Sequence, residues 1–544
     1  MDKPTEKESA VLDTAHLGDI KGALGTIRQG DMDHRNSFWS RFRTFLAILG
    51  PGLIVMVGDN DAGAFGTYAQ AGQDYGTALL WTLLLLVPVL YVNQEMVLRL
   101  GSVTGVGHAR LILERFGKFW GAFSIIDLFI LNALTIVTEF IGITLALGYL
   151  GLPKEWGVVA AAVIVMAAAS TGSFRRFEQF ALILCVGSLV LIPVYFMVHP
   201  PLAVVAHDLF VPQLPKGAKL NDVMLLIIAI IGTTVAPWQL FFQQSYVIDK
   251  RITPRFIPYE RVDLWIGIAI VTVGSIMIMG LAAAVFHGHP EFGNYTDAGA
   301  VAFALEKYAG RLPGVLFAVA LIDASIIGAM AVSLSTAYAI GDMLSLKHSL
   351  HRKPGEAKEF FVVYCGIILI AVALVLIPGV PLGLLTNAVQ ALAGVLLPSA
   401  TVFLLLLCND KAVLGPWINS LRMNIFTGIV LAVLVVLSII LTATVLWPNI
   451  SGQTILAILL GCGILGITAA IWGWVRGRRY PKTASPAVDL ALRDEWRMPP
   501  LSALPPLQLT PGSRLWMYIL RGYLVIAGGL ILIHIVELAV TKHG

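Results

Sequence analysis

Thirteen apolar stretches dominate the sequence, and all but the short fourth one are long enough to cross a lipid bilayer. A transmembrane helix needs about 20 apolar residues, and 57% of the residues here are hydrophobic while only 13% are charged. This balance leaves too little polar surface to coat a soluble globule. The stretches cover residues 43–75, 77–98, 121–150, 157–171, 179–198, 223–246, 263–287, 315–340, 361–379, 383–408, 423–447, 454–475 and 516–540. We therefore expect an all-α polytopic protein, embedded in the bilayer, with about twelve spans plus one extra C-terminal span.

The polar segments between these stretches predict the domain organisation. The first segment lacks the apolar region of a secretory signal peptide and is expected to be a cytoplasmic tail. The segment before the last span is rich in proline and reads as a cytoplasmic linker. The predicted units are a tail (1–42), a core (43–476) with two five-span repeats (about 43–198 and 223–408) plus two further spans, a linker (477–514) and an additional span (515–544).

The distribution of lysine and arginine predicts the orientation. With a cytoplasmic N-terminus, the loops on the cytoplasmic side carry most of the basic residues, as at 175–176, 250–261 and 476–479. This is the pattern of the positive-inside rule. We expect the chain to lie in the inner, or plasma, membrane of a bacterium, with its N-terminus in the cytoplasm, and to be a monomer.

Several classes of function are disfavoured by the sequence. The net charge of +4 is small and the basic residues are dispersed, so a nucleic-acid partner is not expected. The sequence contains no HExxH zinc motif, phosphate-binding loop or GxSxG nucleophile motif with plausible partners. An enzyme is therefore not expected, and neither is a cofactor.

The first apolar stretch is interrupted by VGDNDAGAFG, residues 57–66. A charged side chain at the bilayer centre costs about 2.5–3.5 kcal/mol, so Asp59 and Asp61 are candidate functional groups. Glycine lowers helix propensity, and Gly58, Gly63 and Gly66 surround the two acids. The segment predicts an unwound break between two half-helices, with backbone carbonyls that a polar ligand could satisfy.

A second break is predicted at IGTTVAPWQLFFQQS, residues 231–245. Pro237 lacks an N–H and clashes with the preceding turn, which frees carbonyls near Thr233. The two breaks fall in the first span of each five-span block. Such a pair of interrupted helices is typical of the midplane site of an inverted-repeat transporter. Acidic, amide and carbonyl oxygens facing one another would suit a hard cation.

At these residues the sequence resembles the NRAMP family of divalent-metal transporters, and the resemblance covers about the first 450 residues. It rests on GPG (50–52), DAGA (61–64), QAG (70–72), TEFIGITLAL (138–147), RRFE (175–178), GTTVAPWQ (232–239) and VQALAGVLLP (389–398). The resemblance implies a leucine-transporter-like inverted-repeat fold with discontinuous helices 1 and 6. It also implies that Asp61 and Gln390 bind the metal ion.

The sequence departs from the family pattern at the site itself. Ala64 stands where the family has an asparagine, Ala236 where it has a metal-binding methionine, and Gln239 where it has an asparagine. Loss of the soft thioether ligand favours hard, oxygen-loving ions. Asn60 and Thr233 complete the expected metal site of Asp61, Asn60, Ala64, Thr233, Ala236, Gln239 and Gln390. This pattern resembles the NRAMP-related magnesium transporters.

Proton coupling is expected to be weak or absent. Glu139 matches the family's glutamate in the third helix, but Ile136 stands where an aspartate is usual. A divalent ion gains about 4.6 kcal/mol per 100 mV of inside-negative potential, twice the figure for one charge. Asp59, Glu139 and Asp323 are candidate members of a cation path. We expect transport of Mg²⁺, and also of Mn²⁺, by alternating access of a partly hydrated ion.

Two alternatives remain open from the sequence. One is a proton-coupled Mn²⁺ or Fe²⁺ importer of the NRAMP type. The other belongs to a different class, a receptor or scaffold that keeps the fold but has lost transport. Measured ion flux would separate these possibilities.

Overall fold

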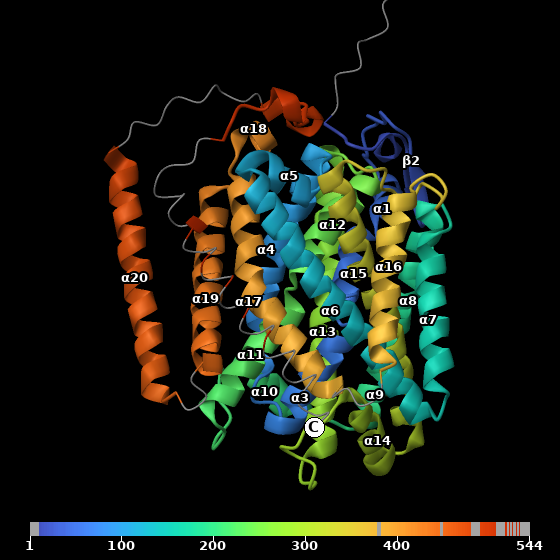
Figure 1. Cartoon of the computed structure of the whole chain (residues 1–544), viewed down its shortest axis with the longest axis vertical. Coiled ribbons are helices and arrows are strands. Elements are labelled where there is room, and N and C mark those ends of the chain that lie inside the picture. Colours follow the sequence, from blue (N-terminus) through green and yellow to red (C-terminus); the bar gives the residue numbers. More distant parts are fainter. Residues whose placement is uncertain are drawn as a thin grey trace, which may run out of the picture.

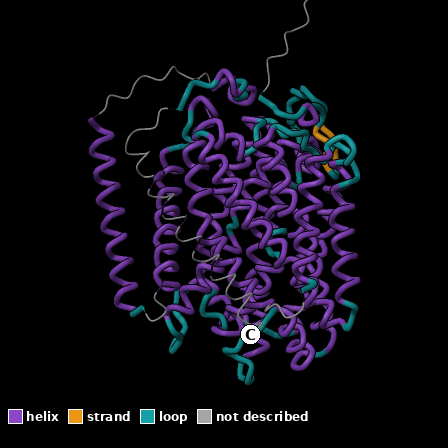
Figure 2. Tube along the Cα trace, viewed as in Figure 1, coloured by secondary structure: helices purple, strands orange, loops and turns teal. Residues whose placement is uncertain are grey.

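The chain forms a bundle of long helices with a small β-hairpin at one end (Figures 1 and 2). The computed structural model describes residues 10–377, 382–446, 450–479 and 490–507, and six single positions between 517 and 533. The hairpin pairs β1 (Ile20–Gly22) with β2 (Gly25–Ile27). We call the end of the bundle that carries this hairpin the N-terminal side.

The helices follow one another across the bundle. Their bounds are α1 Phe38–Ile48, α2 Pro51–Val57, α3 Ala62–Tyr75, α4 Leu80–Thr104, α5 His108–Phe116, α6 Lys118–Leu150, α7 Lys154–Ala169, α8 Phe174–Gly187, α9 Leu191–Met197, α10 Leu202–Phe210, α11 Leu220–Thr234, α12 Pro237–Asp249, α13 Ile257–Phe286, α14 Ala298–Ala309, α15 Arg311–Leu344, α16 Lys358–Val375, α17 Leu382–Cys408, α18 Lys411–Leu414, α19 Leu421–Leu446 and α20 Gly452–Arg479. Short 3-10 turns, η1 to η6, join some of them.

The helical membrane architecture expected from the sequence is confirmed. Within the described residues, nine helices are long and apolar enough to cross a membrane, or ten if α1 and α2, bent by 51°, count as one span. The predicted fourth span is the 16-residue helix α7, and the predicted twelfth is α20. The predicted last span, 516–540, lies outside the described residues except for single positions.

The two broken spans lie inside the bundle. α2 and α3 pack along α13, α11 packs along α17, and α12 packs between α4 and α15. In the most apolar 18-residue stretch of the span formed by α11 and α12, 89% is buried inside the protein. The corresponding share for α19 is 22%. α19 and α20 lie at one edge of the bundle (Figure 1). A polar group on a broken span is therefore surrounded by protein.

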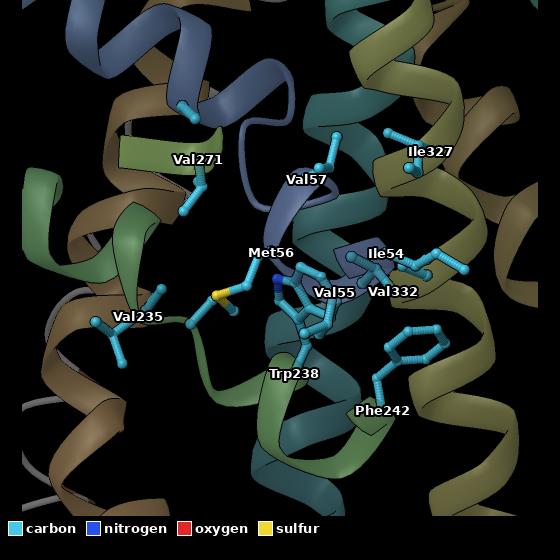
Figure 3. Packing of buried hydrophobic residues seen from close by; sticks show 14 of the residues in the cluster. Ile54, Val55, Met56, Val57, Val235, Trp238, Phe242, Val271, Ile327 and Val332 are labelled. Carbon is cyan, nitrogen blue, oxygen red and sulfur yellow. The ribbon is translucent and has the colours of Figure 1, made fainter. Parts of the chain in front are cut away.

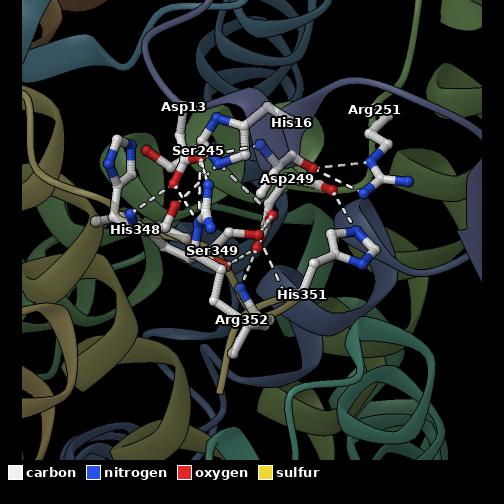
Figure 4. Close-up of polar contacts among 12 residues, drawn as sticks. Asp13, His16, Ser245, Asp249, Arg251, His348, Ser349, His351 and Arg352 are labelled. Atoms are coloured by element: carbon white, nitrogen blue, oxygen red, sulfur yellow. Dashed lines mark hydrogen bonds and ion pairs between the residues drawn. The ribbon is translucent and has the colours of Figure 1, made fainter. Parts of the chain in front are cut away.

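The N-terminal segment, residues 10–36, is folded onto the bundle. Asp13 accepts hydrogen bonds from the His348 N–H at 2.9 Å and from Arg352, both in the α15–α16 loop. His16 Nε2 lies 2.9 Å from the His348 carbonyl oxygen. Figure 4 shows these groups gathered around Asp249, the last residue of α12. The predicted tail is thus tied down wherever the structure describes it.

Arginines of the bundle hold this segment mainly by its backbone. Arg175 of α8 donates to the carbonyl oxygens of Gly22 and Gly25 at 2.9 and 3.1 Å. Arg251 donates to the Ala15 and Asp19 carbonyl oxygens, and Arg255 to those of residues 31–33. The segment therefore bridges α8, the α12–α13 loop and the α15–α16 loop.

Docking of the N-terminal segment should weaken at alkaline pH. Burial lowers the pKa of His348, but the Asp342 carboxylate, 3.1 Å from its Nε2, outweighs burial and raises the pKa to about 9. A histidine whose pKa is raised in the folded state stabilises that state fully below its unfolded-state pKa of about 6.5. This contribution is lost as the pH rises to the folded-state pKa. Limited proteolysis within residues 10–36 should accelerate between about pH 6.5 and pH 9 and change little above that range. A His348→Gln variant should lack this acceleration; equal pH profiles in both proteins would contradict the assignment.

The described part of the predicted linker also contacts the bundle. The Met498 N–H donates to the Val103 carbonyl oxygen of α4 at 3.2 Å. Trp417 Nε1 donates to the Arg493 carbonyl oxygen at 2.8 Å, and Arg115 donates to that of Pro505 at 2.6 Å. Two of these three contacts use carbonyl oxygens of the linker as acceptors, which suits a proline-rich chain with few N–H donors. Residues 490–507 lie on the N-terminal side, as does the N-terminal segment (Figure 1).

Candidate metal centre

Both predicted breaks are present as gaps between half-helices. α2 ends at Val57 and α3 begins after Asp61, which caps it. α11 ends at Thr234, and Val235 and Ala236 are non-helical before α12 begins. Pro237 is the first residue of α12, where its missing N–H removes no helical hydrogen bond. The discontinuous first and sixth spans are confirmed.

Asp61 lies at the N-terminus of α3, against α6 and α15. Its Oδ1 accepts a hydrogen bond from the Ala64 N–H at 2.9 Å. The carboxyl group of Glu139, on α6, lies close to that of Asp61, and its Oε2 accepts a hydrogen bond from the Ala62 N–H at 3.1 Å. A Cβ at Gly328 of α15 would lie 2.7 Å from Glu139 Oε2 and 2.9 Å from the Asp61 Cβ. The missing side chain at Gly328 therefore lets the carboxyl pair form.

A chain of amides joins the two gaps. Gln239 Nε2, on α12, donates to Asp59 Oδ1, and Gln94 Nε2, on α4, donates to Gln239 Oε1 at 2.9 Å. All three side chains are at most 1% exposed. Gln94 was not among the residues predicted from the sequence. The sequence does contain a feature that could have indicated Gln94, because Asn93, Gln94 and Glu95 form a polar run within an apolar helix.

Several buried polar atoms around the gaps have no hydrogen-bond partner. Asp59 Oδ2, Glu139 Oε1, Thr233 Oγ1 and Gln390 Nε2 are among them. Buried polar groups are nearly always paired, so such atoms need an explanation, of which an ion or water is one. A Cβ at Gly63 would lie 1.8 Å from Gln390 Nε2 and 3.1 Å from Asp61 Oδ1, so α17 brings Gln390 beside Asp61.

Two predicted residues face other partners. Asn60 donates to the Val271 carbonyl oxygen at 3.1 Å and accepts from Ser275 Oγ at 3.0 Å, so its amide is bonded to α13. Asp323 of α15 lies against α8, where a Cβ at Gly187 would be 2.5 Å from its Oδ1. The structure brings Asp59, Asp61, Glu139, Thr233, Gln239 and Gln390 around the gaps and places neither Asn60 nor Asp323 in that group. Their roles in binding or in a cation path stay predictions.

The donors that the structure offers are mixed in type. Within the described residues, no group of three His, Cys, Asp or Glu side chains is placed to hold a metal ion. Ala64 and Ala236 carry no side-chain donor and are at most 5% exposed. A cation beside Asp61 would therefore need amide, hydroxyl and backbone oxygens, or its own water, in addition to carboxylate. Those are the ligands that Mg²⁺ accepts.

Packed side chains border the gaps on the N-terminal side and on the opposite side. On the N-terminal side, Met56 of α2 and Trp238 of α12 pack together with Val235 in an apolar cluster (Figure 3). On the opposite side, a Cβ at Gly66 would lie 3.3 Å from Thr386 and 3.4 Å from the Tyr295 hydroxyl. The cavity there is only about 10 Å³. Passage of an ion along either of these two routes requires helix movement.

Comparison with known proteins places the chain in a family. Residues 52–444 match the family model described as Natural resistance-associated macrophage protein-like. A divalent metal cation transporter MntH of Burkholderia ambifaria is 28% identical over 408 residues, which cover 72% of this chain and 87% of the relative. An MntH of Deinococcus radiodurans is 30% identical over 307 residues, which cover 53% of this chain and 68% of the relative.

The fold also has a counterpart among solved structures. A crystal structure of the Eremococcus coleocola manganese transporter, in complex with an aromatic bis-isothiourea substituted compound, aligns with a TM-score of 0.60 and 21% sequence identity. The alignment covers 86% of this chain and 99% of that one. The matched relatives are named as transporters of metal cations and not as enzymes. From the family match over most of its length, this chain belongs to the NRAMP family.

Proposed function

We propose that the chain transports hard divalent cations, Mg²⁺ first and also Mn²⁺, by alternating access with little or no proton coupling. The observation that carries the proposal is the set of groups around Asp61. It offers carboxylate, amide and hydroxyl groups, while Ala236 provides no thioether where the family has a methionine. Oxygen ligands suit Mg²⁺, whereas sulfur ligands favour later transition metals. The ion is the substrate, and no cofactor is needed.

The small side chains at the gaps support a partly hydrated ion. Ala64 and Ala236 occupy less volume than the asparagine and methionine of the family pattern. Mg²⁺ gives up its water reluctantly and usually keeps several molecules when bound. The nearest methionine sulfur along α2, in Met56, packs in the apolar cluster against α13 and Trp238. We infer that water supplies the ligands that the side chains do not.

A proton-coupled Mn²⁺ or Fe²⁺ importer is the second candidate, and one observation favours it. The buried Asp61 and Glu139 carboxyl groups lie side by side at the first gap, and two neighbouring carboxyl groups favour a proton on one of them because like charges repel. Carboxyl pairs of this kind occur in membrane proton relays. The relatives named as manganese or divalent metal transporters are consistent with either candidate.

Flux measurements in proteoliposomes test the two candidates against each other. We expect Mg²⁺ uptake driven by an inside-negative potential, without acidification of the lumen in a fixed ratio to the ion. Mn²⁺ should also enter, and Ca²⁺ serves as the comparison. Stoichiometric acidification with uptake of Mn²⁺ alone would favour the proton-coupled importer. Absence of flux for all three ions, in folded protein, would favour the receptor or scaffold.

Replacing Ala236 by methionine should shift selectivity toward Mn²⁺. A thioether adds a soft ligand and takes up space that ligand water would occupy. We expect the Mn²⁺ over Mg²⁺ ratio of apparent affinities to rise about tenfold, which corresponds to ~1.4 kcal/mol. Ala236→Leu is the matched control, since it fills similar volume without sulfur. An equal shift in both variants would show that volume, and not the sulfur, sets selectivity.

The proposed orientation of the chain in the membrane is based on the position of its basic residues. Arg175, Arg251 and Arg255 lie at the N-terminal side together with the N-terminal segment. By the positive-inside rule this side faces the cytoplasm. We place the chain in the plasma membrane of a bacterium and propose that it acts as a monomer. Protease access to residues 10–36 from one side of sealed vesicles tests the orientation.

A further inference from the structure

Four ionisable side chains are buried together beneath α2, away from the metal centre. They are Glu178 of α8, Lys250 directly after α12, and Glu260 and Asp263 of α13, and each is 0% exposed. If all were ionised, three negative charges would face one positive charge. Each unneutralised charge in a protein interior costs several kcal/mol. The cluster therefore needs another positive charge.

Three members of the cluster have strong partners. Lys250 Nζ donates to Glu178 Oε1 at 2.7 Å and to the carbonyl oxygens of Ile48 and Leu49 at 2.6 and 2.8 Å. Glu178 Oε2 accepts from the Ala23 N–H at 2.6 Å. Asp263 Oδ2 accepts from the Gly52 N–H at 2.7 Å. These bonds join the cluster to the α1–α2 junction and to the N-terminal hairpin.

Glu260 is the exception. Both of its carboxyl oxygens are buried and neither has a hydrogen-bond partner. Glu260 lies close enough to Asp263, Lys250 and Glu178 to interact electrostatically with each of them. Tyr246 of α12 is a further titratable group, and it interacts in the same way with Glu178 and Asp263. α2, Pro51–Val57, contributes no charged side chain. A charged Glu260 would add a third, unpaired carboxylate to a site in which one lysine already serves two.

We propose that Glu260 is a proton-binding site, and that its bound proton holds the N-terminal side of the transporter closed. A proton fits better than a metal ion, because no group of three acidic, His or Cys side chains in the described chain has a metal-binding arrangement. Protonation removes one negative charge and needs no coordination geometry. Glu178 and Asp263 can then stay charged, since each has N–H donors.

The position of the cluster links this proton to gating. A Cβ at Gly50 would lie 2.4 Å from Glu178 Oε1 and 3.2 Å from Lys250 Nζ, so the start of α2 rests directly on the cluster. Movement of α2 away from α13 would admit water, and Glu260 would ionise and release its proton. Alkaline conditions on the N-terminal side should therefore favour opening. This consequence rests on the proposed alternating access, whereas the proton site itself does not.

This proton differs from one carried with the metal ion. Glu260 exchanges its proton with the N-terminal side only, because the apolar cluster of Met56 and Trp238 separates it from the carboxyl groups of Asp61 and Glu139 at the metal centre. No net proton movement across the membrane is required. The rate of ion release would respond to pH on one side without any proton flux.

Hydrogen exchange of α2 in the full-length protein tests the proposal. The rate ratio of wild type to Glu260→Gln cancels the intrinsic effect of pH on exchange, and it also cancels the titration of His348, which both proteins share. We expect this ratio for residues 51–57 to rise about tenfold per pH unit, the slope for one linked proton. Glu291→Gln, which alters an exposed carboxylate paired with Lys307, is the matched control and should give a flat ratio.

A flat ratio for Glu260→Gln would overturn the proposal. So would failure of Glu260→Gln to fold, because glutamine has the shape of the neutral acid and should fit the same space. Infrared difference spectroscopy supplies a second readout, in which the spectrum of wild type minus that of Glu260→Gln should contain one C=O band of a protonated carboxylic acid. Absence of this difference band would also overturn the proposal. Neither readout needs ion flux, so a failure of the proposed Mg²⁺ transport would leave both results interpretable.

Discussion

Replacing Asp61 by alanine is expected to abolish saturable uptake of divalent cations. Asp61 is 3% exposed, caps α3 across the first gap and lies beside Gln390 and Glu139. Loss of a residue that only hydrogen-bonds to a metal ligand commonly costs about 10–100-fold in metal affinity, so loss of the ligand itself should cost at least about 100-fold. Flux of Mg²⁺ and Mn²⁺ into proteoliposomes, with protein content matched, measures the effect.

The control for this experiment is Asp222→Asn. Asp222 is an exposed carboxylate in the first turn of α11, at the end remote from the gap. Its replacement removes the same charge without touching the centre and should leave uptake within about twofold, since exposed substitutions usually change stability by under 0.5 kcal/mol. Equal uptake by wild type and Asp61→Ala would exclude Asp61 as a ligand and would also remove the main support for the proposed site.

Replacing Gly232 by valine should destabilise the whole bundle. A Cβ at Gly232 of α11 would lie 2.1 Å from the Gln390 carbonyl oxygen and 2.4 Å from the Gly394 backbone nitrogen of α17. Backbone atoms cannot rotate away as a side chain can, so the two helices must separate. Overpacking of this kind typically costs 1–3 kcal/mol, and we expect about 3 kcal/mol or more here. Thermal unfolding in detergent, followed by the loss of monodisperse protein, checks this.

Gly428→Val is the matched control for Gly232→Val. Gly428 lies on α19, and a Cβ there meets no atom within 4 Å. The same substitution should therefore change the unfolding temperature little. A similar loss of stability in both variants would mean that helix propensity, and not the close contact of α11 with α17, dominates the effect.

The broken helices could be predicted because their cause is local. Gly58 weakens a helix, Asp61 is a favoured cap at a helix start, and Pro237 is tolerated only in the first turn, so both gaps lie where these residues predict a helix boundary. The apolar stretches were equally local, since a stretch of sufficient length defines a span by itself. The positions of α7 and α20 follow from the same signal.

The partners of the polar residues could not be predicted in the same way. Asn60 bonds Val271 and Ser275 of α13, more than 200 positions away in the chain, and that contact depends on how α13 packs beside α2. Gln94 enters the centre only because α4 packs on α12. A single sequence identifies a polar side chain within a span, but only the packing of the spans decides which other side chain it meets.

The folded N-terminal segment was missed for a related reason. Residues 10–36 contain no long apolar run and gave no signal of structure. Their order comes from arginines elsewhere in the chain, above all Arg175, Arg251 and Arg255. A segment that is held by distant donors resembles an unstructured tail in sequence.

The way these arginines hold the segment affects how it can vary in evolution. Because guanidinium groups bind its main-chain oxygens, which every amino acid supplies, most of its side chains are free to change while its path is kept. Substitutions should therefore accumulate faster along residues 15–33 than at the three arginines. The segment would then diverge among relatives while its attachment to the bundle persists.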